Sequence, residues 1–192
     1  TLPSWLVKYP NRMLIPPTAY FAERALARQQ RPGGMATASR PAANSLAASI
    51  YEAPDYLDCF VVDAPTGRFE SVDDVATAWF TEQPWWLRMV STNTLTKSRV
   101  VEAISTDRYR VGTKVGSWQV IDRNDDEIVF GDDMGFMQYR FSFRLEANAD
   151  QVEATTAVKY LWPRTGRLYF ALVRPFHQRF IKLLLKLTVR PA

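Results

Sequence analysis

The segment Met137-Gln138-Tyr139-Arg140-Phe141-Ser142-Phe143-Arg144-Leu145 decides the fold, because apolar and polar residues alternate along it. Side chains of a β-strand point alternately to the two faces of the sheet, so this segment predicts a strand with one buried and one solvated face. Half-buried strands of this kind are typical of antiparallel sheets. The segment therefore indicates one strand of an antiparallel sheet with a single apolar face.

The two-residue period continues on both sides of this strand, and turns rich in Asp, Asn and Gly separate the alternating segments. The further expected strands are 56–62, 118–120, 128–130 and 152–162, and the turns are 123–126, 131–135 and 147–150. Consecutive strands joined by tight turns form a meander. We therefore expect a curved antiparallel sheet across residues 59–162.

The segment from about residue 165 to residue 187 predicts a long amphipathic helix, with apolar residues at three- and four-residue spacing. These are Tyr169, Leu172, Val173, Phe176, Phe180, Leu183, Leu184 and Leu187. Pro175 should kink or split the helix, because it removes the donor for the carbonyl of Ala171. An apolar sheet face needs a cover, so we predict an α+β fold in which the sheet wraps around this helix.

Two shorter helices and an irregular extension are expected before the meander. Ser71 should cap one helix, and Pro84 should open a second that continues toward Ile104. Residues 1–54 contain seven prolines and an Ala- and Ser-rich stretch, which predicts an N-terminal extension and linker outside a folded domain of residues 55–192. The extension is also Arg-rich and nearly free of acids, as transit peptides are.

Charge is distributed unevenly along the chain. The formal net charge is +4, but residues 1–40 carry +5, residues 41–153 carry −9 and residues 154–192, which contain no acid, carry +8. A basic C-terminal segment can contact anionic lipid, nucleic acid or the acidic body of the protein itself. We expect it to pack on the sheet with its cations in water, and a membrane surface is a less favoured partner.

Several classes of site are absent from the sequence. It has no glycine-rich phosphate loop, zinc-type spacing, nucleophile elbow or RNA-binding motif, so we expect no cofactor, no metal and no nucleic-acid partner. The single cysteine, Cys59, excludes an internal disulfide and lies in an apolar run typical of a buried core residue. No run of about 18 apolar residues predicts a membrane span, and a cytoplasmic location is the default expectation.

Two polar features are candidates for chemistry. His177 is the only histidine, and as a general base it would need a positioned acid; otherwise it is a structural or solvent-facing helix residue. Asp132 and Asp133 lie between two glycines, where paired acids can bind a cation or share a proton. Adjacent residues usually diverge, so a solvated turn is the favoured interpretation. We assign no catalytic residue.

Five motifs carry a resemblance to a known family. They are Asp58-Cys59-Phe60 with Pro65, Pro84-Trp85-Trp86, Gly116-Ser117-Trp118, Glu127–Gly131, and Gly166-Arg167-Leu168-Tyr169 leading into Arg174–His177. From about residue 55 to residue 190 the chain resembles the bacterial domain-of-unknown-function family 2867 (DUF2867). That family is placed in the helix-grip (SRPBCC) superfamily of START-like and Bet v 1-like ligand-binding domains, so the resemblance implies a cavity between the sheet and the final helix.

One departure from the family pattern concerns chemistry. Family members often carry a His-Leu-Asp step after the glycine and acidic turn, whereas this chain has Phe136, Met137 and Gln138 there. The resemblance therefore implies that any chemistry carried by that histidine and aspartate is lost here.

The ring-rich composition and the resemblance together favour a non-enzymatic domain that binds a small apolar or aromatic ligand. The expected cavity residues are Trp85, Trp118, Tyr139, Tyr160, Tyr169 and Phe176, with Arg174 and His177 as polar contacts. One alternative is a cyclase- or hydratase-type enzyme on the same fold, using His177 or Asp132. Another is a protein that binds a membrane surface or a protein partner through its basic C-terminal helix.

Overall fold

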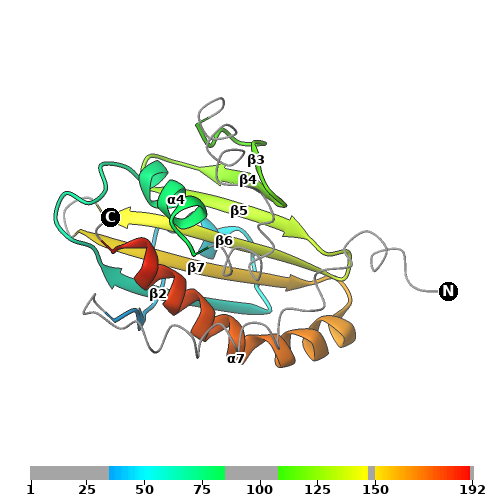
Figure 1. Ribbon diagram of the computed structural model, residues 1–192. Coiled ribbons are helices and arrows are strands. Elements are labelled where there is room, and N and C mark those ends of the chain that lie inside the picture. Colours follow the sequence, from blue (N-terminus) through cyan, green and yellow to red (C-terminus); the bar gives the residue numbers. More distant parts are fainter. Residues whose placement is uncertain (1–34, 85–107, 147–149, 191–192) are drawn as a thin grey trace.

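A single antiparallel sheet organises the residues described by this computed structural model, namely 35–84, 108–146 and 150–190 (Figure 1). Within these residues, seven strands lie in the order β1-β2-β7-β6-β5-β4-β3, and each neighbouring pair is antiparallel. The strands are β1 (Thr37–Ala38), β2 (Tyr56–Asp63), β3 (Lys114–Val115), β4 (Trp118–Arg123), β5 (Glu127–Asp133), β6 (Met137–Glu146) and β7 (Gln151–Tyr160). The predicted α+β class and the alternating strands are confirmed.

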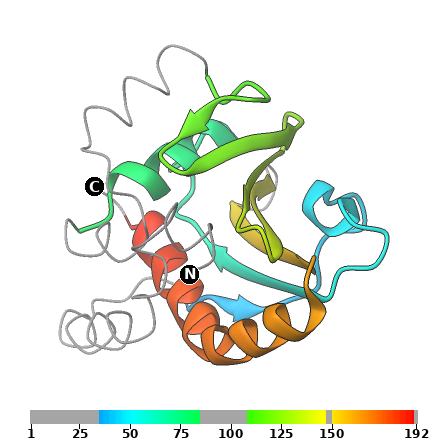
Figure 2. The ribbon, with the colours of Figure 1, turned by 90° about the vertical axis from the view of Figure 1, so that its right-hand side faces the viewer.

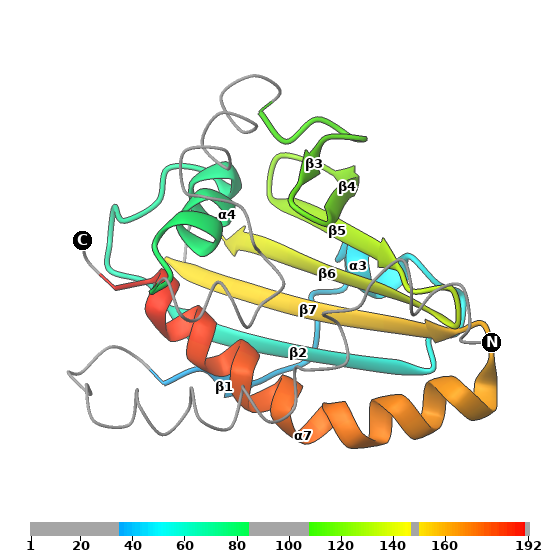
Figure 3. The same ribbon diagram turned by 45° about the vertical axis from the view of Figure 1, so that its right-hand side comes forward.

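Helices lie on both faces of this sheet. The described helices are α3 (Leu46–Ser49), α4 (Val72–Thr81) and α7 (Pro163–Thr188). Figures 2 and 3 show α4 and α7 against the concave inner face, and α3 against the outer face. The long C-terminal helix is confirmed, whereas most of the helix expected from Pro84 toward Ile104 lies outside the described residues.

The inner face holds the main core. The alternating apolar residues of β6 point into it, and Phe143 lies 4.7 Å from Trp79 of α4 between ring centroids. The C-terminal half of α7 adds Ile181, Leu184 and Leu185 to the same core. Burial of these side chains is the main favourable contribution to folding, at about 25 cal/mol per Å² of apolar surface.

The outer face of the sheet is more buried than the sequence predicts. The polar residues of β6 were expected to be solvated, but Arg140 and Ser142 are buried. Helix α3 contacts β5, β6 and β7 on this side, and the buried carboxylate of Glu127 anchors it. That carboxylate accepts hydrogen bonds from the Ser45 hydroxyl and from the backbone N–H groups of residues 46 and 47, over 3.0, 2.8 and 3.2 Å.

The segment before residue 55 therefore contributes to the sheet and its cover. Strand β1 pairs with β2 through Thr37 and Ala38, and α3 packs on the outer face. Residues 37–38 and 46–49 thus form regular structure within a segment that the sequence predicts to be an irregular extension. Proline content alone does not reveal a two-residue strand or a four-residue helix, because both depend on tertiary contacts.

The buried stripe of α7 is also rotated from the expected one. The sequence pattern favoured a stripe through Leu172 and Phe176, yet Leu172 is exposed and Phe176 is only partly buried. The buried residues are Gly166, Phe170, His177, Ile181, Leu184, Leu185 and Thr188. The helix is continuous through Pro175, so it is not split there, and it changes direction along its length (Figure 3).

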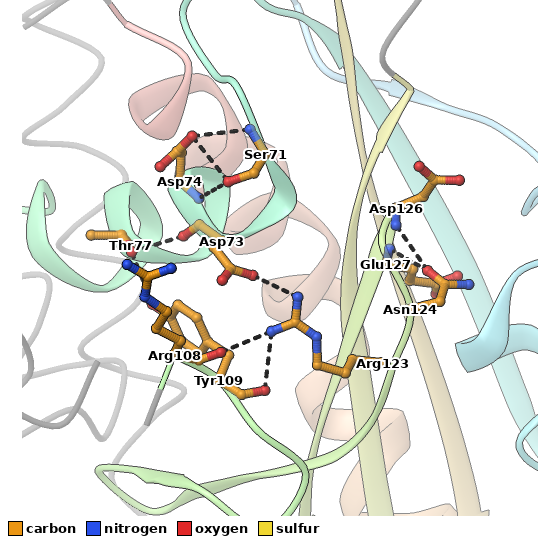
Figure 4. A network of polar contacts seen from close by, with 10 residues as sticks. All are labelled: Ser71, Asp73, Asp74, Thr77, Arg108, Tyr109, Arg123, Asn124, Asp126 and Glu127. Carbon is orange, nitrogen blue, oxygen red and sulfur yellow. Dashed lines mark hydrogen bonds and ion pairs between the residues drawn. The ribbon is translucent and has the colours of Figure 1, made fainter. Parts of the chain in front are cut away.

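Helix α4 is held by a capping box and an arginine. Ser71 and Asp74 exchange side-chain to backbone hydrogen bonds, as the sequence predicts for a capped helix. Figure 4 shows Arg123 of β4 between the helix and the chain before β3. Its guanidinium lies 3.0 Å from the Asp73 carboxylate and donates to the Arg108 carbonyl over 2.8 Å. This contact ties α4 to the sheet edge.

Candidate functional site

A cluster of polar side chains lies on the inner face, between the sheet and α7. Tyr56 and Asp58 come from β2, Tyr139 from β6, and His177 and Gln178 from α7. Tyr56 and Tyr139 both pair with Val158 of β7 from opposite sides, so they share one face across that strand. Asp58 lies two residues further along β2 and therefore points the same way. We call these five residues the Asp58–His177 cluster.

Contacts within the cluster form a continuous chain. The Nδ1 of His177 is 3.5 Å from the Tyr139 hydroxyl, and its Nε2 is 3.6 Å from Oδ2 of Asp58. Tyr56 donates a short hydrogen bond to the same Asp58 oxygen, and the Gln178 side-chain amide donates to the Tyr56 hydroxyl over 3.0 Å. The single histidine therefore lies between a carboxylate and a phenol.

Two atoms of the cluster have unused hydrogen-bonding capacity. The side chains of His177 and Asp58 are only 7% and 11% exposed. Among the described residues, neither Nε2 of His177 nor Oδ1 of Asp58 has a hydrogen-bond partner. Buried polar atoms are usually satisfied, because an unmet bond costs about 1–3 kcal/mol. These two atoms are therefore suited to bind a polar group of a ligand.

Aromatic rings surround the polar atoms. The Phe170 ring lies 4.5 Å from that of Tyr56, and the Trp118 ring lies 5.5 Å from that of Tyr139, between centroids. The Arg174 guanidinium is 5.3 Å from the centroid of the Tyr56 ring, a cation–π distance. The cluster thus combines a few polar atoms with a mostly apolar wall.

Both phenols of the cluster keep their protons well beyond neutral pH. Burial is the main cause that raises the pKa of Tyr56, and its hydrogen bond to Asp58 and the charge of Asp58 add to it. Burial likewise raises the pKa of Tyr139, with the Asp58 charge as the next cause. Tyr139 therefore remains able to donate a hydrogen bond at any physiological pH.

This arrangement can hold or move a proton. An imidazole between a carboxylate and a phenol has the parts of a general acid–base group, provided that a substrate reaches Nε2. The Asp58 carboxylate and the Tyr139 hydroxyl flank the ring on its two nitrogen sides. The same atoms can instead fix the orientation of a ligand without any reaction.

The structure brings part of the predicted site together. His177 and Tyr139 are in direct contact, Trp118 lies against Tyr139, and Arg174 reaches the cluster through Tyr56. The predicted Trp85 lies outside the described residues.

The other predicted side chains lie beside the cluster. Tyr160 and Tyr169 pack on a second apolar group centred on Phe136 and Phe170, and the Tyr169 ring is 5.3 Å from that of Phe136. Phe176 is partly buried on α7. Tyr56 and Tyr139 pack on the same apolar group, which connects these rings to the Asp58–His177 cluster.

Sequence reasoning missed Tyr56, Asp58 and Gln178. A signal for Asp58 exists, because it occupies an inward position of β2, in phase with the buried Phe60 and Val62. A carboxylate at an inward strand position needs a partner, and the only histidine on the last helix was the natural candidate. The pairing of β2 with β7, which brings the two together, is not visible in the sequence.

The two acids of the β5–β6 turn diverge. Asp133 is exposed and pairs with Arg140 over 2.8 Å, whereas Asp132 shares the inner-face register of Tyr139. No group of three or more potential metal-ligating side chains (His, Cys, Asp or Glu) occurs within the described ranges. None of the helices described here has the length and apolar character that crossing a bilayer requires.

Comparison with known proteins identifies a family but no individual relative. No curated protein and no solved structure matches the chain. A family model does match, over residues 50–183, and its description is "Protein of unknown function (DUF2867)". The match covers most of the chain, including the sheet from β2 to β7 and α7 as far as Leu183, and it contains both partners of the Asp58–His177 cluster. The chain therefore belongs to the DUF2867 family of proteins of unknown function.

Proposed function

We propose that this protein binds a small, largely apolar or aromatic molecule on the inner face of the sheet, with the Asp58–His177 cluster as the polar end of the site. The observation that carries the proposal is a pair of buried atoms, Nε2 of His177 and Oδ1 of Asp58, that lie among aromatic rings and have no hydrogen-bond partner in the described part of the chain. Small-molecule sites typically combine an apolar wall with a few polar groups that fix orientation.

The arrangement of elements supports a helix-grip type of binding domain. An antiparallel sheet curves around α7, and the early strand β2 lies beside the last strand β7 (Figure 2). This places the two ends of the family match, β2 and α7, on either side of the proposed site. A ligand there would contact Trp118, Tyr139 and Phe170 on its apolar side.

The direct test is a ligand screen with matched variants. Fatty acids, aromatic polyols and an anilinonaphthalene sulfonate dye are tested by thermal shift, and the purified protein is examined by native mass spectrometry for bound molecules. For a stabilising compound, Tyr139→Phe should weaken binding about two- to twelvefold, because one hydrogen bond contributes about 0.5–1.5 kcal/mol.

Tyr109→Phe is the control for that screen. It also removes one buried hydroxyl, which contacts Thr77 at 3.2 Å beside α4, away from the cluster. Equal affinities of the Tyr139 and Tyr109 variants would remove the cluster from the site. A screen in which no compound stabilises the protein and none co-purifies would contradict the proposal as a whole.

A second candidate function is general acid–base catalysis of the cyclase or hydratase kind. It is favoured by the contacts of His177 with both Asp58 and Tyr139, which supply a proton acceptor, a carboxylate and a proton donor within one cluster. His177→Gln should abolish turnover, measured by mass spectrometry at saturating concentrations of a bound compound, because the variant also loses one atom of the proposed binding site. Unchanged turnover in that variant would exclude His177 as the acid or base.

A further inference from the structure

The N-terminal half of α7 carries exposed apolar side chains that the proposed ligand site does not use. Leu168 and Leu172 are 69% and 64% exposed, and they lie one helical turn apart on the same side. Just before the helix, Leu161 and Trp162 are 48% and 54% exposed. We call these four residues the α7 patch. In Figures 1 and 3 this half of α7, in orange, runs along the lower edge of the molecule.

Basic residues flank the α7 patch. Arg164 and Arg167 are exposed in the first turns of α7, and within the described residues neither forms an ion pair with a carboxylate. No acid occurs anywhere in residues 154–192. The nearby Asp55 accepts a hydrogen bond from the Tyr160 backbone and lies 3.7 Å from Lys159, so its charge is already engaged.

The opposite side of the same helix half is buried. Gly166 and Phe170 face the sheet, so α7 can present its leucines outward without losing its attachment. A leucine and tryptophan surface flanked by arginines is the pattern of a helix that lies in a membrane interface. Tryptophan favours the headgroup level, and arginines near the surface attract anionic lipid.

We propose that the α7 patch docks the protein on an anionic membrane surface, with Leu168 and Leu172 entering the acyl boundary and Arg164 and Arg167 contacting lipid phosphates. An anionic bilayer is the partner that the positive charge of this helix complements. A dimer that pairs the α7 patches of two copies would bring arginines against arginines, because residues 154–192 contain no acid. This proposal does not depend on the ligand site.

The test uses the full chain and vesicles of two compositions. Phosphatidylcholine vesicles containing phosphatidylserine should sediment the protein, and pure phosphatidylcholine vesicles should bind it far more weakly. Arg164→Gln with Arg167→Gln should weaken binding to the anionic vesicles about thirtyfold, since each basic residue near the surface contributes about 1 kcal/mol. Added salt should weaken binding of the wild-type protein in the same direction.

Two further variants test the apolar contacts. Leu168→Glu with Leu172→Glu should abolish sedimentation at an unchanged melting temperature, because both side chains are exposed. Val111→Glu is the matched control, since Val111 is 61% exposed in the turn before β3, and Figure 1 shows β3 at the opposite side of the molecule from α7. That substitution adds one negative charge away from the α7 patch. It should change vesicle binding by no more than about twofold relative to wild type.

Tryptophan emission provides an independent readout. On anionic vesicles the emission should shift to shorter wavelength, and the shift should disappear in Trp162→Phe. Equal binding to both vesicle types, an effect of Val111→Glu as large as that of the leucine variants, or no binding at all would overturn the proposal. A concentration-dependent dimer that the leucine substitutions abolish, without vesicle binding, would assign the patch to a second copy and also overturn it.

Discussion

Single residues show how burial changes chemistry in this protein. Cys59 is the only cysteine and is 2% exposed on β2. Burial raises the pKa of its thiol to about 12, and the charge of Glu153 adds to the effect. Because only the thiolate attacks electrophiles and disulfides, the residue that the sequence predicts to be a core cysteine should also be inert.

The prediction for Cys59 is tested by labelling. Native protein at neutral pH should react with Ellman's reagent at least about a hundredfold more slowly than protein unfolded in guanidinium, since reaction of the native thiol requires opening of the sheet. Cys59→Ser provides the blank. Rapid labelling of the native protein would show that this part of β2 is accessible and that the buried position is wrong.

Glu127 is a second residue whose role depends on burial. Its carboxylate accepts three hydrogen bonds from the start of α3, so both oxygens are engaged. Glu127→Gln replaces one acceptor oxygen by a donor that faces another donor. We expect the free energy of unfolding to fall by about 2–3 kcal/mol, the usual contribution of bonds to a charged group.

Urea unfolding measures this loss. Glu146→Gln is the control, because Glu146 is exposed at the end of β6 and should change stability by less than about 0.5 kcal/mol. If Glu127→Gln is as stable as the control, α3 does not depend on the carboxylate, and the assignment of residues 45–49 to the folded domain loses its main support.

At the scale of elements, α7 shows what the sequence could and could not predict. Its length and its apolar periodicity were predictable, and so were the strand alternation of β6 and the Ser71 cap of α4. The side of α7 that is buried was not predictable. The helix carries leucines on two sides, and the sequence does not show which side the sheet covers. His177 therefore appeared as an isolated candidate, and its partner Asp58 was found only through the pairing of β2 with β7.

Gly166 fixes how closely the start of α7 approaches β7. A Cβ atom at this position would lie 2.6–2.9 Å from the ring and Cβ of Tyr160, closer than such atoms pack. Gly166→Ala should therefore lower stability by about 1–3 kcal/mol through this clash, although alanine favours a helix interior by about 1 kcal/mol.

A double-mutant cycle separates these two effects. In a Tyr160→Gly background all three of these Tyr160 atoms are absent, so Gly166→Ala should there raise the free energy of unfolding, measured in urea. An equal loss of stability in both backgrounds would place the strain elsewhere. The contact matters for the α7 patch as well, because it attaches the helix half that carries Leu168 and Leu172.

For the whole molecule, the tyrosines couple stability to pH. Burial raises the pKa of Tyr56, Tyr109 and Tyr139 above the tyrosine value of about 10 that applies to the unfolded chain. Below that pH these three phenols are therefore protonated in both the folded and the unfolded state. Above it the unfolded chain loses its phenolic protons first, so the folded state becomes progressively less favoured as pH rises toward each raised pKa.

The stabilisation lost at alkaline pH can be assigned to a single phenol with one variant. Tyr109 is fully buried between α4 and β5, so at about pH 11 its retained proton should lower the free energy of unfolding by about 1.4 kcal/mol. Tyr109→Phe removes this dependence and nothing else that titrates, since lysines contribute equally to both proteins. Urea unfolding between about pH 8 and pH 11 should give a steeper decline for wild type than for the variant, by up to about 1.4 kcal/mol per pH unit. If the free energies of unfolding of wild type and variant decline in parallel, Tyr109 titrates at the same pH in the folded and the unfolded chain. That result would contradict its buried position between α4 and β5.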